Sequence, residues 1–499
     1  QIMKNMYMQK SLFIISIILL LGFSCCKPKK QVVKPNLLII QTDEHNFRTL
    51  GCYRETLTHD QAFLWGDSVA VETPEIDALA EDGVLCTSFY ASTPVCSPSR
   101  SSFISGLYPQ NTGVITNDIP LLDEIISFAH VLTEQGYATG YAGKWHLDGD
   151  GKPQWDPDRN FGFIDNRYMY NRGHWKMIED TDNGPRVASL NAKGNADYGL
   201  KGVNEENFTT DYLTKKTIDF IKAHKDEPFC YMLSYPDPHG PNTVRAPYNS
   251  MYEHFVFEKP YTHGAEVDDL PSWGKKAKNT IRPKAIANYW GMVKCIDDNV
   301  GKIVSYLEES DLLDNTIVVF TSDHGDLLGE HHKDNKGNPY EGSAKIPFII
   351  RYPSKLPAGL VINQALSVVD FTPTILSLMD APGTGYEEGR DASLLFSGDM
   401  NIDWTDIAFM RGTGSKDGTD DKWLSAVSDR YKIVFSPEPE DLPWLFDLQE
   451  DPDELVNFFK HPDYQEIRKE MSAHLIEYGK KMNDGIIYHP KISKELAGN

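Results

Sequence analysis

The 499-residue sequence lacks the features of several classes of protein. It contains no internal repeat and no low-complexity block, and its composition excludes a disordered chain, a collagen-like repeat and a multi-span membrane protein. Basic residues are scarce, since 49 Lys and Arg stand against 72 Asp and Glu and give a formal net charge of −23. The chain therefore has no basic face to release counterions from phosphate, which argues against a nucleic-acid partner. An anionic substrate would have to meet cations that are concentrated in a cleft.

Cysteine is also scarce, and its spacing does not match a zinc site. None of the seven cysteines forms a Cys-x-x-Cys pair, which argues against structural zinc. Two of them, Cys25 and Cys26, lie close to the N-terminus. The others are Cys52, Cys86, Cys96, Cys230 and Cys295. Because this second set is odd in number, at least one of its members in an exported protein is free or chemically used.

The apolar run at residues 11–23 is too short to cross a bilayer, but it suits the hydrophobic region of a signal peptide. Lysines precede this run, and small residues with Cys25 follow it in a pattern that resembles the lipobox of bacterial lipoproteins. We expect a lipoprotein-type signal peptide at residues 1–24, lipidation of Cys25 or of its neighbour Cys26, and a tether at residues 25–35. The protein would then be exported, as a periplasmic or outer-membrane-anchored lipoprotein. An ordinary secretory signal that is cleaved nearby is the alternative.

Four short apolar runs that end in polar residues predict buried strands. They lie at residues 36–41, 137–142, 229–235 and 316–321. Helical patterns alternate with these runs, at residues 76–82, 99–105, 122–135, 210–224 and 284–308. This alternation predicts an α/β fold in which a large, mostly parallel sheet is covered by helices on both faces.

The composition of the sequence changes near Asp380, where glycine and acidic residues suggest a domain boundary. Beyond this point, short strand-like runs precede a helical pattern at residues 464–482. We therefore expect a main domain at residues 36–380 and a smaller C-terminal subdomain at residues 381–499, built from an antiparallel sheet and a helix. Residues 145–209 are rich in Gly, Asn and Asp and poorly periodic, which predicts an irregular surface region that faces the substrate.

Polar and charged side chains follow each of the four predicted strands. The clusters are Asp43-Glu44, Lys144-Trp145-His146, Asp237-Pro238-His239 and Asp323-His324. Ligands of open α/β sheets bind in the crevice beyond the carboxyl ends of the strands, so the four clusters should converge there. The sequence therefore predicts one functional site at this edge of the sheet.

Two of these clusters, Asp43 with Glu44 and Asp323 with His324, are candidate ligands of a divalent cation. Adjacent acidic groups at a strand end repel each other unless a cation lies between them. The alternative is that these acids cap the helices that follow. A ligand set that consists mostly of oxygen favours Ca²⁺ or Mg²⁺ over Zn²⁺.

A cysteine at the start of a predicted helix is the candidate reactive residue. Ser97 is a suitable N-cap, Pro98 suits the first helical position, and Gly106 suits the end of the helix. Cys96 would then lie at a helix N-terminus, where backbone N–H groups stabilise an anion, with Arg100 one turn further on. The alternative is a buried structural cysteine before an ordinary helix.

The segment Cys96-Ser97-Pro98-Ser99-Arg100 resembles the Cys-x-Pro-x-Arg motif of the type I sulfatases, and residues 101–109 resemble its usual continuation. The resemblance covers most of residues 36–460. It implies an alkaline-phosphatase-like fold in which residues 36–380 form the catalytic domain. It also implies that a separate maturation enzyme oxidises Cys96 to formylglycine, the nucleophile of this family.

The resemblance gives most polar residues of the expected site a role. It implies a bound Ca²⁺, in preference to Mg²⁺, with Cys96 as a formylglycine that also touches the metal. The implied protein ligands are Asp43, Glu44, Asp323 and His324. The family usually has Asp where Glu44 stands and often Asn where His324 stands, so this sequence departs from the pattern at two positions.

The same resemblance implies catalytic residues that contact sulfate, and Arg100 as the residue that steadies the formylglycine. The sulfate-contacting residues are Lys144, His146, His239 and Lys336. His239 is the candidate acid for the departing sugar oxygen and His146 is the candidate base, although outside this context either histidine would suit an ordinary core or surface position. Lys333 and Lys345 compete with Lys336 for its role.

These roles together imply hydrolysis of sulfate monoesters on a sulfated carbohydrate, such as an algal polysaccharide or a glycosaminoglycan oligosaccharide. Arg172 and His174 are candidates to bind a uronate or a second sulfate, with packing and surface solvation as the alternative. The expected partners are the sulfated carbohydrate, the maturation enzyme and a lipid anchor in the membrane, with no nucleic acid. The rival functions are a phosphonate or phosphate monoester hydrolase of the same superfamily and a non-catalytic glycan-binding lipoprotein.

Overall fold

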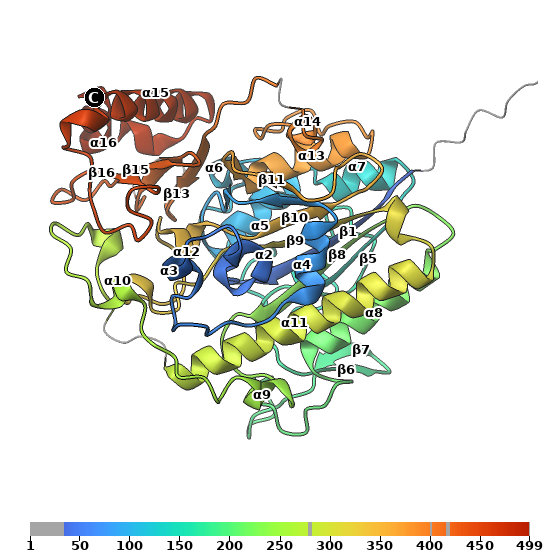
Figure 1. Ribbon diagram of the computed structural model, residues 1–499. Coiled ribbons are helices and arrows are strands. Elements are labelled where there is room, and N and C mark those ends of the chain that lie inside the picture. The colour runs from blue at the N-terminus through green and yellow to red at the C-terminus, as the bar shows by residue number, and fades with distance from the viewer. Residues whose placement is uncertain (1–33, 278–281, 400–401, 416–419, 499) are drawn as a thin grey trace, which may run out of the picture. The chain divides into compact units, whose positions relative to one another are not determined.

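The computed structural model describes residues 34–277, 282–399, 402–415 and 420–498 (Figure 1). The chain divides into two units, Gln1–Lys34 and Pro35–Asn499, and all described residues after Lys34 belong to the second unit. The predicted signal peptide and the lipidation site lie outside the described residues. Among the helices of the described ranges, none combines the length and the apolar character that a membrane span requires.

The second unit is built on an eight-stranded mixed sheet. In spatial order its strands are β11 (Leu360–Ile362), β2 (Val84–Cys86), β10 (Phe348–Arg351), β9 (Thr316–Ser322), β1 (Asn36–Asp43), β8 (Phe229–Pro238), β4 (Ala138–Lys144) and β5 (Asp165–Tyr170). The five strands from β9 to β5 are parallel, whereas β10 runs antiparallel to both of its neighbours. The predicted α/β fold with a mostly parallel sheet is therefore confirmed.

The central strand β1 shows why the sheet needs helices on both faces. Its residues Leu37 and Ile39 pack into one hydrophobic core, and the alternate residues Leu38 and Ile40 pack into another. The first core includes side chains of α5 (Cys96–Ser105), α7 (Phe128–Glu134) and α13 (Phe371–Leu378). The second includes side chains of α4 (Pro74–Glu81), α8 (Thr209–Ala223) and α11 (Pro283–Glu309), and Figure 1 shows α8 and α11 side by side.

Two predicted elements differ from the structure. The helix expected at residues 122–135 begins only at Phe128, because the Ser127 side chain accepts hydrogen bonds from the backbone N–H groups of Ala129 and His130 and caps the helix there. The segment 145–209 was expected to be irregular, but it contributes the edge strand β5 to the sheet. The sequence did not reveal β5 because its six residues, Asp165–Tyr170, are mostly polar and lie within a longer polar segment.

The C-terminal part of the unit contains a separate antiparallel sheet, as predicted. Its strands are β13 (Ala408–Arg411), β14 (Leu424–Val427), β15 (Tyr431–Phe435) and β16 (Trp444–Asp447), and α15 (Gln465–Lys481) packs against it. Residues of the two sheets belong to one compact unit, and the boundary between residues 380 and 381 stays a prediction.

Shorter elements connect these layers. They are α2 (Gly51–Arg54), α3 (His59–Ala62), β3 (Phe89–Tyr90), α6 (Pro109–Thr112), β6 (Ile178–Thr181), β7 (Gly184–Val187), α9 (Tyr248–Met251), α10 (Tyr261–Gly264), α12 (Glu341–Ala344), β12 (Leu366–Ser367), α14 (Ser393–Phe396) and α16 (Pro490–Ala497).

The packing of β1 leads to a stability prediction. Replacing the fully buried Ile39 by alanine leaves a cavity between the sheet and its helices, so Ile39→Ala should lower the free energy of unfolding by about 2–5 kcal/mol. Val361 lies in the edge strand β11 and is 46% exposed, so Val361→Ala should change it by less than about 0.5 kcal/mol. Chemical denaturation measures both values, and equal effects would contradict this account of the core.

Candidate active site

The four polar clusters of the sequence lie together because the strands that carry them are neighbours. Strands β9, β1, β8 and β4 are adjacent and parallel, so their carboxyl ends lie at one edge of the sheet. Asp43 ends β1, Lys144 ends β4, and Asp323 directly follows β9. His239 directly follows β8. All four clusters therefore meet at the predicted edge.

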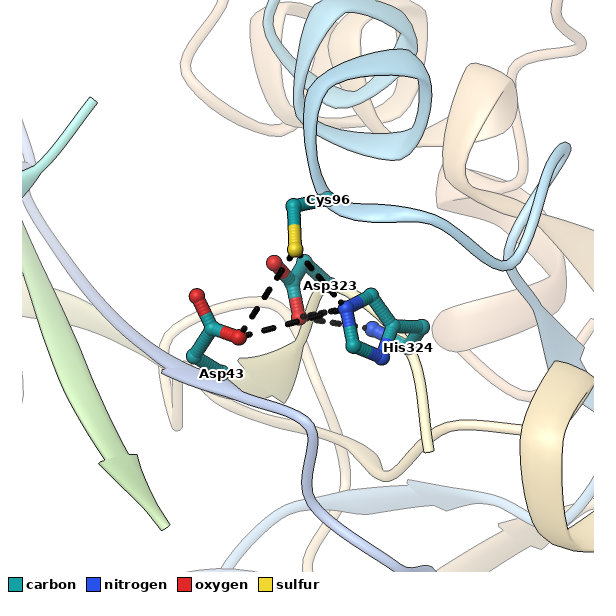
Figure 2. A group of neighbouring side chains, drawn as sticks. All are labelled: Asp43, Cys96, Asp323 and His324. Carbon is teal, nitrogen blue, oxygen red and sulfur yellow. Dashed lines mark hydrogen bonds and ion pairs between the residues drawn. The ribbon is translucent and has the colours of Figure 1, made fainter. Parts of the chain in front are cut away.

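Four buried side chains form a group that is able to hold a metal ion (Figure 2). They are Asp43, Cys96, Asp323 and His324, and one ligand atom from each lies within 4.8 Å of all the others. The Cys96 Sγ atom is 3.1 Å from His324 Nε2 and 3.9 Å from Asp43 Oδ1. In Figure 2 the four side chains point toward a common centre. We call these residues the metal-ligand group.

Cations hold the outer oxygens of this group. Arg100 donates from Nε to Asp323 Oδ2 at 2.8 Å and from Nη2 to Asp43 Oδ2 at 3.0 Å, and Lys144 Nζ lies 2.5 Å from the same Asp43 oxygen. Burial by itself raises the pKa of Asp43, but Lys144, His239 and Arg100 outweigh burial and hold it well below its usual value. These cations thus keep the buried Asp43 carboxylate ionised.

Cys96 is the first residue of α5, as the sequence predicts for a residue at a helix N-terminus. The predicted cap was wrong, because Val95 occupies the N-cap position and Ser97 instead donates its backbone N–H to Asn117 Oδ1 at 3.0 Å. Gly106 ends the helix with a φ of 73°, which favours glycine. At this position of α5 the Sγ atom of Cys96 points toward the other three residues of the metal-ligand group.

The pKa of the Cys96 thiol reflects its charged neighbours. Burial and the nearby Asp43 carboxylate act to raise the pKa, whereas Lys144, Lys336 and His324 act to lower it. The three cationic neighbours prevail, and the pKa lies well below that of an ordinary thiol. The surroundings of residue 96 therefore stabilise an anion.

Glu44 lies beside the metal-ligand group but outside it. Its backbone has a φ of 62° and its N–H donates to Asp323 Oδ1 at 3.1 Å, while its carboxylate turns toward two cationic side chains. Oε2 lies 2.9 Å from His239 Nε2, and Oε1 lies 3.2 Å from Lys336 Nζ. Burial raises the pKa of Glu44, but His239 and Lys336 lower it to about 2. The structure thus pairs Glu44 with the sulfate-contacting candidates rather than with the other expected metal ligands.

The sulfate-contacting candidates form a second layer around the metal-ligand group. Lys336 Nζ lies 2.7 Å from His239 Nε2, and Lys144 Nζ lies 2.9 Å from His174 Nε2. The rings of His174 and His239 stack with their centroids 3.5 Å apart. The sequence suggests His174 as a candidate to bind a uronate or a second sulfate, and the structure places it in contact with Lys144.

The competing lysines point elsewhere. Lys333 donates its Nζ hydrogens to the carbonyl oxygen of Lys275, and Lys345 forms an ion pair with Glu341 at 3.0 Å. Of the three candidates, only Lys336 contacts Glu44 and His239 within the described residues.

His146 and Arg172 share a partner that the sequence did not single out. His146 Nε2 and Arg172 Nη1 each lie 2.9 Å from Asp118 Oδ1. Arg172 is thus paired with a carboxylate, and its expected role in binding a uronate or a second sulfate stays a prediction. Ser234 is another contributor without a sequence signal, because its hydroxyl accepts a hydrogen bond of 2.7 Å from Arg100 Nη1.

Comparison with known proteins supports these assignments at the level of the family. The family model described as Sulfatase matches residues 35–381, and a second one, described as N-sulphoglucosamine sulphohydrolase, C-terminal, matches residues 329–481. An ulvan-active sulfatase of Formosa agariphila is 27% identical, with 90% of this chain and 83% of that protein covered. An N-acetylglucosamine-6-O-sulfatase of Bacteroides thetaiotaomicron is 24% identical, with 92% and 89% covered.

A solved structure agrees with the fold. The putative sulfatase yidJ of Bacteroides fragilis matches with a TM-score of 0.72 and 26% identity, over 93% of this chain and 99% of that one. The Sulfatase model covers more than half of the chain, and it contains the metal-ligand group and its surrounding cations. The chain therefore belongs to the sulfatase family, whose members depend on a metal, and it is a sulfatase.

Proposed function

We propose that this protein hydrolyses sulfate monoesters of a carbohydrate, with Cys96 converted to formylglycine and Ca²⁺ in the metal-ligand group. The observation that carries the proposal is the position of Cys96 at a helix N-terminus, within 4 Å of Asp43 and His324, with Lys144 and Lys336 lowering the pKa of its thiol. The carbohydrate is supported by the relatives, since one is named for ulvan and another for N-acetylglucosamine.

The residues of the metal-ligand group fit a divalent cation. Asp43 and Asp323 are fully buried carboxylates, and their Oδ1 atoms lie beside His324 Nε2 at 3.9 and 3.5 Å. Ca²⁺ prefers oxygen ligands, which formylglycine at residue 96 would add to the two carboxylates. A bound Ca²⁺ lowers the pKa of a hydroxyl that it touches and neutralises developing negative charge.

Formylglycine in its hydrated form supplies two hydroxyl groups, one to attack sulfur and one to release sulfate afterwards, which a serine or cysteine cannot do. Around it, Arg100 fixes the two carboxylates of the metal-ligand group. Lys144 and Lys336 both lower the pKa of the Cys96 thiol, so each acts on residue 96 through its charge. These ammonium groups are placed to stabilise the charge that grows on the sulfate oxygens.

His239 is the candidate proton donor to the departing sugar oxygen. Its Nδ1 lies 2.8 Å from the carbonyl oxygen of Gly240, which accepts a hydrogen bond and fixes the orientation of the ring. Its Nε2 lies between Glu44 and Lys336, at 2.9 and 2.7 Å. This atom is the ring nitrogen from which a proton would pass to the departing oxygen.

His146 is the candidate proton acceptor. Asp118 accepts a hydrogen bond from Nε2, because a carboxylate carries no donor of its own, and this leaves the lone pair of a neutral imidazole on Nδ1. That Nδ1 atom is buried and has no hydrogen-bond partner among the described residues. Asp118 thus holds His146 with its Nδ1 lone pair free, and the residue before Asp118, Asn117, contacts the N-terminal turn of α5.

We also propose that the chain is exported and anchored through Cys25, and that a maturation enzyme modifies Cys96. Both proposals rest on the sequence patterns at residues 11–26 and 96–100. A phosphonate or phosphate monoester hydrolase remains the rival activity. The arrangement around residue 96 suits any tetrahedral anion, so only relative rates on paired esters separate the two.

The first prediction concerns residue 96. Protein from a host with the maturation enzyme should carry an aldehyde at Cys96 in peptide mass spectra, while Cys52, Cys86, Cys230 and Cys295 stay thiols. It should hydrolyse 4-nitrophenyl sulfate faster than the matching phenylphosphonate ester, and Cys96→Ala should reduce the rate by at least about 10³-fold. If the modified enzyme hydrolyses the phosphonate faster, sulfate hydrolysis is not its main activity. If the protein is active with an unmodified Cys96, formylglycine is not its nucleophile.

The second prediction concerns Lys336. Lys336→Met should reduce kcat by about 10²- to 10³-fold, because a cation that stabilises the transition state is lost. Lys333→Met is the matched control, since Lys333 lies three residues away and bonds only to the Lys275 carbonyl among the contacts described for it. Steady-state kinetics on 4-nitrophenyl sulfate measures both variants. Equal losses would mean that the effect comes from net charge and not from the site.

The third prediction concerns the metal. Ca²⁺ at a free concentration about 100 times its Kd should stabilise the mature protein by about 2.7 kcal/mol, because it binds only the folded state. Asp323→Asn should abolish most of this gain, whereas Asp380→Asn, at a largely exposed aspartate, should keep it. Thermal unfolding with and without Ca²⁺ provides the measurement. If Asp323→Asn keeps the full stabilisation by Ca²⁺, the ion binds at another site.

A further inference from the structure

The metal-ligand group has an unusual mixture of donor atoms when residue 96 is an unmodified cysteine. It offers one sulfur, one imidazole nitrogen and two carboxylate oxygens, all buried. The Sγ atom is 3.1 Å from His324 Nε2 and 3.9 Å from Asp43 Oδ1. His324 Nε2 is 3.9 Å from Asp43 Oδ1 and 3.5 Å from Asp323 Oδ1.

The separations between these donor atoms match those around a metal ion that binds four ligands tetrahedrally through short bonds. A tetrahedral Zn²⁺, with bonds of about 2.0–2.3 Å, places its donors roughly 3.3–3.6 Å apart. The observed separations of 3.1–3.9 Å bracket this range. Ca²⁺ instead takes about six to eight oxygen ligands, and a thiolate is a poor ligand for it. The unmodified donor set therefore fits Zn²⁺ better than Ca²⁺.

The residues behind the donors hold them in position. Arg100 and Lys144 bind the Oδ2 atom of Asp43, and Arg100 also binds the Oδ2 atom of Asp323, so that both Oδ1 atoms face the centre of the group. His324 Nδ1 lies 3.0 Å from the carbonyl oxygen of Gly325, so Nε2 is the ring nitrogen that binds a metal once it has lost its proton. Outer contacts of this kind orient metal ligands and raise metal affinity.

We propose that the chain with unmodified Cys96 binds one Zn²⁺ in the metal-ligand group, and that conversion of Cys96 to formylglycine changes the preference of the site from Zn²⁺ to Ca²⁺. Zn²⁺ binding forms a bond to the Cys96 thiolate and a bond to His324 Nε2, and any proton on Sγ or on Nε2 passes to solvent. The conversion replaces this sulfur by oxygen and leaves a set that consists of three oxygens and one nitrogen. The statement about Zn²⁺ is independent of the proposed function, and the statement about Ca²⁺ rests on it.

The change in preference has a consequence for the activity. Zn²⁺ held by the thiolate would occupy the position of the catalytic cation and cover the sulfur of residue 96. Chain that escapes modification would therefore be a closed and inactive zinc form rather than an empty one. Modification would both supply the nucleophile and remove the ligand that makes the site select zinc.

The test uses full-length protein produced without the maturation enzyme, with the thiol at Cys96 confirmed by mass spectrometry. Titration with Co²⁺ as a probe for zinc should give one equivalent of a tetrahedral spectrum with a thiolate-to-cobalt charge-transfer band, and Zn²⁺ should displace the Co²⁺. Millimolar Ca²⁺ should not displace it. Cys96→Ser should lose the band and bind Zn²⁺ at least about 100-fold more weakly in a competition with a chromogenic chelator.

Cys230→Ala is the matched control, because Cys230 is a buried cysteine within β8 and should leave the band and the Zn²⁺ affinity unchanged. Circular dichroism confirms that both variants are folded. A band that survives in Cys96→Ser, or Co²⁺ that Ca²⁺ displaces from the thiol form, would overturn the proposal. Repeating the competition on modified protein tests the second half, in which Ca²⁺ should now displace Zn²⁺. An inactive modified enzyme would reject the proposed function and leave the zinc result untouched.

Discussion

The guanidinium group of Arg100 joins two carboxylates that would otherwise repel each other inside the protein. Asp43 and Asp323 end adjacent parallel strands and are fully buried, so their charges need partners of opposite sign. Arg100 contacts both, and Lys144 contacts Asp43 as well. This one arrangement leaves an oxygen of each carboxylate facing Cys96 and His324, and the rest of the site is built around it. A protein without this bridge would have no ordered set of metal ligands.

Charge compensation also explains how an acidic protein acts on an anion. The chain carries a formal net charge of −23, yet Lys144, Lys336 and Arg100 lie together beside the buried carboxylates of the site. Each of these cations is paired with a buried carboxylate in the structure. Local pairing therefore matters more than net charge, because buried charges are screened much less than those on the surface.

The C-terminal sheet contributes to the site through the segment that carries Lys336. Trp423 donates from Nε1 to the carbonyl oxygen of Gly337 at 3.2 Å. Lys432 of β15 lies 2.8 Å from Glu341 and 2.6 Å from Glu454, and all three are buried. These contacts join the small sheet to the segment between Lys336 and α12. Although its strands carry none of the expected catalytic residues, the sheet supports one of the two lysines that face residue 96.

The sequence by itself determined the four central strands, the parallel sheet and the polar clusters at one edge, because apolar runs of six or seven residues that end in polar or charged groups have few other solutions in an α/β fold. It also determined that Cys96 lies at a helix N-terminus. Tertiary structure decided what local patterns do not encode. The pairing of Glu44 with His239 and Lys336, and the sharing of Asp118 by His146 and Arg172, depend on contacts between segments far apart in the chain. An acidic side chain is able to bind either a metal ion or a cationic side chain. The residues that surround it in the folded protein decide which of the two it binds.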